Sequence, residues 1–174
     1  MAYFISILFG AAPTRFVLPV IPDLSVLNFL RVAVIGAAAA LSGILFCISL
    51  KRSANFFSGK IKNYYLRPVL GGLIFLAMTL ILRTTDYNGS GMDVIIRATE
   101  GGTVVPYAFL LKIIFTAVTI GSGFRGGEIV PTMFIGATLG CTAAALLGLP
   151  PSFGAALGIA AMFCAVVNCP MASI

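Results

Sequence analysis

The sequence contains no histidine, and only 9% of its 174 residues are charged. Ordinary soluble domains carry about a quarter charged residues. The absence of histidine removes the commonest metal ligand and general base, and with it histidine-based catalytic triads and the metalloprotease motif. We therefore expect that the protein is not an enzyme and that it needs no cofactor and no metal.

Cysteine is also scarce. The four cysteines (Cys47, Cys141, Cys164 and Cys169) lie within or beside apolar runs, and none shows C-x-x-C spacing. This pattern suggests neither a zinc site nor a disulfide framework. We expect small buried hydrophobic side chains instead.

Acidic residues number 5 against 11 lysines and arginines, which gives a net charge of +6 and a pI near 9.5. In a soluble protein this balance would raise the question of nucleic acid. Here most basic residues flank apolar runs, where they anchor helices to lipid headgroups. We expect no nucleic-acid partner.

Apolar residues dominate, at 60% of the chain, and the mean hydropathy is +1.10. A water-soluble fold could not bury that much apolar surface, so we predict an all-α, multi-pass protein of the cell membrane with the lipid bilayer as its solvent. Residues 1–174 form a single membrane domain in this interpretation. The start shows no signal-peptide pattern and the end has no polar tail, so we expect part of a longer protein.

The first predicted transmembrane helix covers residues 28–50, where Gly36, Ala40 and Gly43 offer a small-residue stripe for close helix contact. Residues 51–67 are polar, basic and aromatic, and we predict an interfacial loop there. A second helix is expected over residues 68–82.

Residues 86–102 are too polar to cross the bilayer in contact with lipid. We predict a short helix over 92–99 that covers the bundle or re-enters the membrane without spanning it. Residues 104–120 could span, but Lys112 lies at their middle. An intramembrane lysine costs about 2.5–3.5 kcal/mol on insertion scales. Lys112 should therefore face protein, water or an anion path.

The residues from Gly121 to Gly127 cannot form a regular helix in lipid, because their backbone groups would lack partners. Pro131 suits the first turn of the helix that continues over residues 133–147. The unpaired amides at its start and its positive dipole end predict an anion site, and the two preceding glycines leave room for an ion. A plain glycine turn between two helices is the alternative.

Near the C-terminus, Gly136 and Gly140 form a G-x-x-x-G pair, as do Gly154 and Gly158, which is typical of tightly packed helices. A short helix is expected from the Pro150–Pro151 pair to about residue 167, with a break at residues 168–170. Helices of this length fit broken or re-entrant helices that meet inside the bilayer.

The stretch from Gly121 to Gly123, followed by GEIVP from Gly127 to Pro131, resembles the G-x-F-x-P anion-binding motif of the CLC family of chloride channels and anion/proton exchangers. Three further stretches agree with this family: LRPVLGGL (66–73), NGSGMDVI (88–95) and LGIAAMFCAVVNCPMASI (157–174). Together they cover most of the chain in the family's order.

The resemblance implies chloride transport by a homodimer in which each subunit has its own pore, built from two inverted halves, with protons as a second partner in the exchangers. This chain is similar to most of the second half. The implied anion-binding residues are Gly127, Glu128, Ile129, Val130 and Pro131, with the amides of Glu128 and Ile129 on the anion. The implied pathway residues are Lys112, which matches a basic residue frequent in the family, Arg125 and Ser122. The helix over residues 28–50 would lie at the dimer interface.

The motif departs from the family at two positions. Ile129 stands where phenylalanine is preferred, which loses little because the backbone is the ligand. Glu128 is either a solvated cap of the helix or a residue that tunes anion selectivity, with Arg125 as a nearby counter-charge. An acidic residue here is also similar to the fluoride-exporting branch of the family. A fluoride-selective F⁻/H⁺ antiporter and a non-transporting membrane scaffold therefore stand as alternatives.

Overall fold

A computed structural model describes residues 22–23, 25–101 and 103–167 of the chain. Within these ranges there is no strand, and the predicted all-α fold is confirmed. The helices are α2 (Val26–Lys60), α3 (Leu66–Leu82), α4 (Met92–Thr99), α5 (Ala108–Gly121), α6 (Ile129–Leu147) and α7 (Pro151–Val167). Cys169 and the predicted break at residues 168–170 lie outside the described residues.

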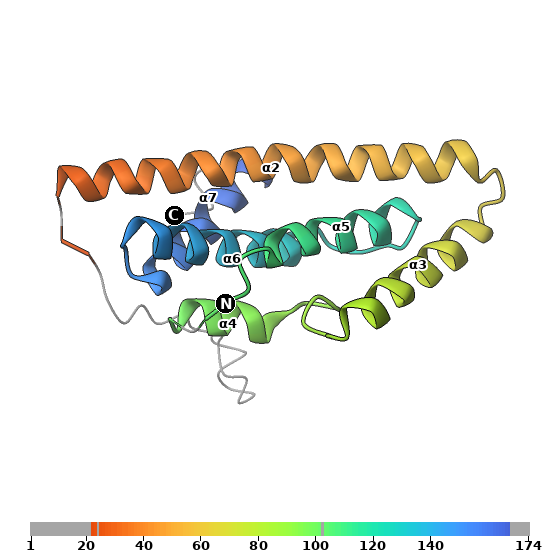
Figure 1. Ribbon diagram of the computed structural model, residues 1–174. Coiled ribbons are helices and arrows are strands. Elements are labelled where there is room, and N and C mark those ends of the chain that lie inside the picture. Colours follow the sequence, from red (N-terminus) through yellow and green to blue (C-terminus); the bar gives the residue numbers. More distant parts are fainter. Residues whose placement is uncertain (1–21, 24, 102, 168–174) are drawn as a thin grey trace, which may run out of the picture.

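The long helix α2 runs along one side of the bundle and contacts α5, α6 and α7 (Figure 1). Helix α6 is central, since it also contacts α4, α5 and α7. On the side away from α2 lies α4, while α3 slants away from the end of α2 and contacts α5. The bundle therefore places α5 between α2 and α3, with α6 beside it.

Among the described residues, two helices, α2 and α6, are long and apolar enough to cross a membrane, and α3, α5 and α7 are shorter apolar helices. Many of their outward-facing side chains are apolar: Val26, Ile81 and Leu146 are 87%, 80% and 88% exposed. Such a surface would be unfavourable in water and suits hydrocarbon. The mixture of long and short helices agrees with the predicted broken-helix architecture.

The predicted loop over residues 51–67 is wrong in its first ten residues, which continue α2 to Lys60. Polar and basic residues mark where a helix leaves an apolar environment, and they do not by themselves end it. Phe57 stays buried, so packing against the bundle continues along this part of α2. The connection to α3 is confined to residues 61–65, and Pro68 lies in the first turn of α3 as expected.

Two details of the predicted helices also differ. Helix α5 begins at Ala108 instead of residue 104, because Pro106 disfavours helical backbone at Val105. Of the predicted small-residue stripe on α2, only Gly43 is buried, against Ala165 of α7, while Ala40 is exposed. The face through which α2 packs is made of Ile35, Ala39, Ser42, Gly43 and Phe46. The positions of the small residues alone did not identify this face.

The two G-x-x-x-G pairs pack against each other, which confirms the predicted close helix contact. A Cβ on Gly136 would overlap the backbone of Gly158, and a Cβ on Gly140 would overlap the backbone of Gly154. This pairing makes α6 and α7 antiparallel neighbours, because Gly136 precedes Gly140 while its partner follows Gly154. The absence of side chains lets the two backbones approach, which is the usual device for helix pairs in membranes.

One layer of the core takes a single side chain from each of four helices. Phe46, Ile113, Ile135 and Met162 come from α2, α5, α6 and α7, and they form one buried cluster. Dispersion and exclusion of solvent stabilise such a layer. The layer fixes α5 and α6 relative to each other, and the candidate site lies between them.

Candidate functional site

A cavity of about 370 Å³ lies between the segment before α4, helix α5 and the start of α6. Helix α5 presents one face to it, because the lining residues Lys112, Thr116, Thr119 and Ile120 recur at helical spacing. The full lining is Phe75, Tyr87, Gly89, Ser90, Lys112, Phe115, Thr116, Thr119, Ile120, Gly126, Gly127, Val130 and Pro131. The cavity therefore combines aromatic walls, hydroxyl groups and glycine backbone.

The turn between α5 and α6 brings the start of α6 to this cavity. Its Gly123 has a φ of 99°, a conformation that favours glycine. The carbonyl of Glu128 accepts hydrogen bonds from the amide and the hydroxyl of Thr132, at 3.1 and 2.6 Å. Among the described residues no acceptor is found for the amides of Ile129 and Val130, as expected for a first helical turn. The predicted helix start with unpaired amides is present.

The five predicted anion-binding residues divide into two groups. Gly127, Val130 and Pro131 line the cavity, together with Gly126. Glu128 and Ile129 are exposed and are absent from the lining, and Ile129 is 54% exposed. The backbone at the start of α6 therefore borders the cavity, while the side chains of Glu128 and Ile129 lie outside it.

Lys112 is only 2% exposed and borders the cavity from α5. Its ammonium donates hydrogen bonds to the carbonyl of Tyr87 at 3.0 Å and to that of Gly89 at 2.8 Å. It also lies over the ring of Phe134, 4.8 Å from the centroid. The sequence predicts that Lys112 faces protein, water or an anion path. In the structure its ammonium contacts three protein groups, and the residue borders the cavity.

Ser122 lies apart from the cavity lining. It is fully buried, its hydroxyl donates to the carbonyl of Thr119 at 2.9 Å, and its side chain fills the space beside Gly71 of α3. Arg125 is exposed on the turn, and in the described part of the chain no ion pair joins it to Glu128. The role of Arg125 as a nearby counter-charge to Glu128 and the pathway roles of Ser122 and Arg125 remain predictions.

Glu128 makes no capping hydrogen bond to the helix that it precedes. Its backbone is in the right-handed helical region, with φ −87° and ψ −16°, whereas capping side chains normally depend on an extended residue. The interpretation of Glu128 as a cap is therefore limited to the attraction between its charge and the helix dipole.

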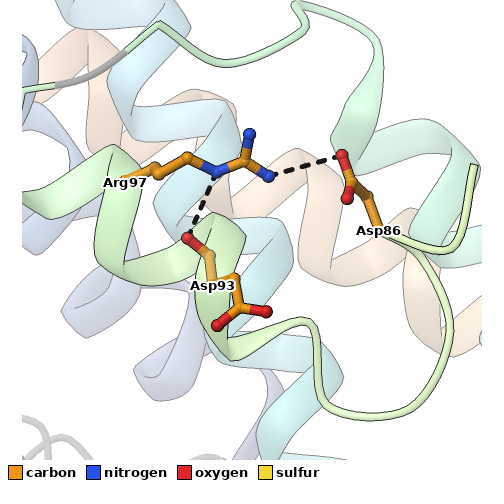
Figure 2. A network of polar contacts seen from close by, with 3 residues as sticks. All are labelled: Asp86, Asp93 and Arg97. Atoms are coloured by element: carbon orange, nitrogen blue, oxygen red, sulfur yellow. Dashed lines mark hydrogen bonds and ion pairs between the residues drawn. The ribbon is translucent and has the colours of Figure 1, made fainter.

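The segment between α3 and α4 forms the wall opposite the start of α6, and it is tied on its outer side. Arg97 pairs with Asp86 of this segment at 3.3 Å and donates to the carbonyl of Asp93 within α4 (Figure 2). Both partners of the ion pair are about half exposed, at 52% and 49%. Thr79 of α3 adds a hydrogen bond to Asn88 at 3.2 Å.

Tyr87 presents its ring at the inner side of the same segment. Burial raises the pKa of its phenol above the ordinary value, and the nearby Tyr107 and Asp86 raise it further. The phenol therefore stays neutral at physiological pH and keeps its hydroxyl proton. Its ring packs with those of Phe115 and Phe134 at 6.0 and 6.2 Å between centroids.

Sequence reasoning missed much of the lining. Thr116 and Thr119 could have been found, since they lie one and two turns after Lys112 on the same helix face. Phe75 and Tyr87 reach the cavity through tertiary packing, and no local pattern marks them, whereas Gly89 lies in the NGSGMDVI stretch (88–95) that resembles the CLC family.

The whole chain, residues 1–174, matches the family model described as voltage gated chloride channel. A chloride/fluoride channel protein of Pseudomonas syringae pv. tomato is 32% identical over 171 residues, which are 95% of this chain and 38% of that protein. The H(+)/Cl(-) exchange transporter ClcA of Vibrio cholerae is 28% identical over 168 residues, 88% of this chain and 35% of that protein.

A solved structure of a CLC-type fluoride/proton antiporter superposes with a TM-score of 0.88 at 32% identity. The match covers 94% of this chain and 42% of that one. The chain thus spans about two fifths of the length of the relatives that it matches.

Proposed function

Because the chain belongs to the voltage-gated chloride channel family, we propose that it forms part of the anion pathway of a membrane chloride transporter, either a channel or an anion/proton antiporter. The observation that carries this proposal is the start of α6, where the amides of Ile129 and Val130 have no acceptor among the described residues and where the cavity is lined by Gly126, Gly127, Val130 and Pro131. A helix N-terminus of this kind attracts an anion through its amides and its dipole.

The lining of the cavity fits an anion in two further respects. No carboxylate is found among the described residues that line it, and its one charged group is the ammonium of Lys112. The hydroxyl of Thr116 is a donor available to a partly dehydrated ion, whereas that of Thr119 donates to the carbonyl of Phe115 at 2.8 Å. A cation would meet no compensating charge here, so the local field favours negative ions.

The complete pathway requires more chain than this. Since the matched relatives are more than twice as long, we propose that residues 1–174 supply one half of an inverted pair and that the other half completes the pore. The assembled protein would be a multi-pass homodimer in the cell membrane, with one pore in each subunit and α2 at the dimer interface.

Fluoride is the second candidate substrate. Two relatives at 32% identity carry fluoride in their names, a chloride/fluoride channel protein and a fluoride/proton antiporter. Glu128 bears on this alternative, because an acidic residue at this position is similar to the fluoride-exporting branch of the family. Fluoride is smaller than chloride and can approach fixed charges more closely, so the carboxylate would change the energy of fluoride by more than that of chloride.

Anion efflux from liposomes tests the proposal. The full-length protein that carries this chain is reconstituted, and chloride and fluoride efflux are compared at equal gradients, with and without a proton gradient. Chloride efflux well above that of empty liposomes is expected, and a response to the proton gradient would identify an antiporter. Preference for fluoride would select the second candidate, and no flux of either ion would favour a non-transporting membrane scaffold.

A further inference from the structure

Among the described residues that line the cavity, Lys112 carries the one cation, and its ammonium is already engaged by protein groups. A lysine offers three N–H donors. Two of them meet the carbonyls of Tyr87 and Gly89 at 3.0 and 2.8 Å, and the remaining direction faces the ring of Phe134. An anion in the cavity would have to displace one of these contacts before it could bind the ammonium directly.

The two acceptors belong to the segment that forms the wall facing the start of α6. Tyr87, Gly89 and Ser90 all line the cavity. Without the lysine, the carbonyls of Tyr87 and Gly89 would present unpaired negative dipoles at a site meant for an anion, and a buried unpaired carbonyl is itself costly. The lysine therefore neutralises these dipoles and holds the segment in place.

The other ties of this segment are weaker or lie on its outer side. The ion pair between Arg97 and Asp86 is about half exposed, and ion pairs of this class contribute little to stability. Lys112 reaches the segment from 23 and 25 residues away in the sequence and binds it from the buried side. Hydrogen bonds from a charged donor are the stronger class in such surroundings.

We infer that Lys112 is a positioning residue that holds the Tyr87–Ser90 segment as one wall of the anion cavity, and that it is not a ligand of the anion. The importance of this wall for anion transport rests on the proposed function. The contact between Lys112 and the Tyr87–Ser90 segment can be tested without measuring transport. The two roles predict different behaviour for neutral hydrogen-bond donors at this position.

The first measurement is hydrogen–deuterium exchange of the full-length protein in lipid nanodiscs. Lys112→Met removes all donors, so exchange at the amides of residues 85–95 should accelerate about tenfold or more. Lys112→Arg keeps the donors and should stay near the wild type, and Arg97→Gln, which removes the outer tie, serves as the matched control. Unchanged protection of α6 and α7 shows that the fold is retained. Wild-type exchange over 85–95 in Lys112→Met would overturn the inference.

The second measurement is the dependence of anion flux on anion concentration. The side chain in Lys112→Gln has no charge but still donates hydrogen bonds. A positioning role therefore predicts that Lys112→Gln keeps an anion flux nearer to the wild type than Lys112→Met does. The flux lost in Lys112→Met should be mainly a fall in the maximal rate. A direct ligand role predicts that Gln and Met raise the half-saturation concentration equally, and this result would contradict the inference. A wild-type protein without any flux would defeat the proposed function alone, because the exchange experiment still decides the contact.

Discussion

Gly140 of α6 and Gly154 of α7 lie so close that a Cβ on either residue would overlap the backbone of the other. The contact joins the central helix of the bundle to its neighbour, and Gly136 and Gly158 repeat it one turn away. Because backbone meets backbone, no rotamer change can relieve an added methyl group. The two helices would have to separate.

Gly140→Ala is therefore expected to lower the free energy of unfolding by about 1–3 kcal/mol, the usual range for overpacked sites. Gly36→Ala is the matched control, since a Cβ there meets nothing within 4 Å and alanine favours helix. Denaturant unfolding in detergent, followed by circular dichroism, measures both. Equal stability of the two variants would show that α6 and α7 can move apart freely.

A second prediction concerns Ser122, which fills the space beside Gly71 of α3. Gly71→Ala should destabilise the protein by about 1–3 kcal/mol, because the new methyl group would overlap the serine side chain. Adding Ser122→Gly makes room and should recover part of the loss, although it removes the hydrogen bond to Thr119. A double-mutant cycle of unfolding free energies measures the coupling. Additive losses would contradict the packing.

Gly127→Ala tests the approach of the backbone to the anion. A Cβ on Gly127 meets nothing within 4 Å, so stability should stay unchanged, while the added methyl group would narrow the cavity beside the amides. Loss of one amide contact to an ion corresponds to about tenfold weaker binding or more. Anion flux in liposomes at subsaturating concentration measures it, with Gly59→Ala as control, where a Cβ is equally free of contacts. Normal flux in Gly127→Ala would remove this glycine from the pathway.

Glu128→Gln tests the exposed carboxylate at the helix start. Since Glu128 makes neither a capping bond nor an ion pair within the described part of the chain, folding should be unaffected. If its charge tunes selectivity, the ratio of fluoride to chloride flux should change severalfold, because the field at the start of α6 changes by one unit charge. Arg125→Gln, on the same turn, is the control for a general charge effect. An unchanged ratio of fluoride to chloride flux in Glu128→Gln would show that the carboxylate does not tune selectivity and interacts only with the dipole of α6.

Much of this fold could be predicted from local patterns. The short helix over residues 92–99 and the helix after Pro131 have clear signals, since glycine or proline stands at their starts. The length of α2 could not, because Lys51 and Arg52 signal the edge of an apolar region and not the end of a helix. Charge and secondary structure are separate properties, and the basic residues report only the first.

The candidate site was predicted in part for a similar reason. The glycines before α6 and the exceptional Lys112 are visible in the sequence, because each is out of place in a plain transmembrane helix. The partners of Lys112 are backbone carbonyls, which every residue carries, so no residue type marks them. Which side of the turn faces the cavity is likewise set by packing, and this separates Gly127 from Glu128.

The 35 residues of α2 correspond to about 52 Å of helix, well beyond the hydrocarbon thickness of about 30 Å in a typical bilayer. A helix of this length accommodates such mismatch by tilting or by extending past the headgroups. Near its far end, Ser53 packs against Gly121, the last residue before the turn that leads to α6. A thinner or thicker membrane changes the preferred tilt of α2, so this contact links lipid chain length to the turn at the start of α6.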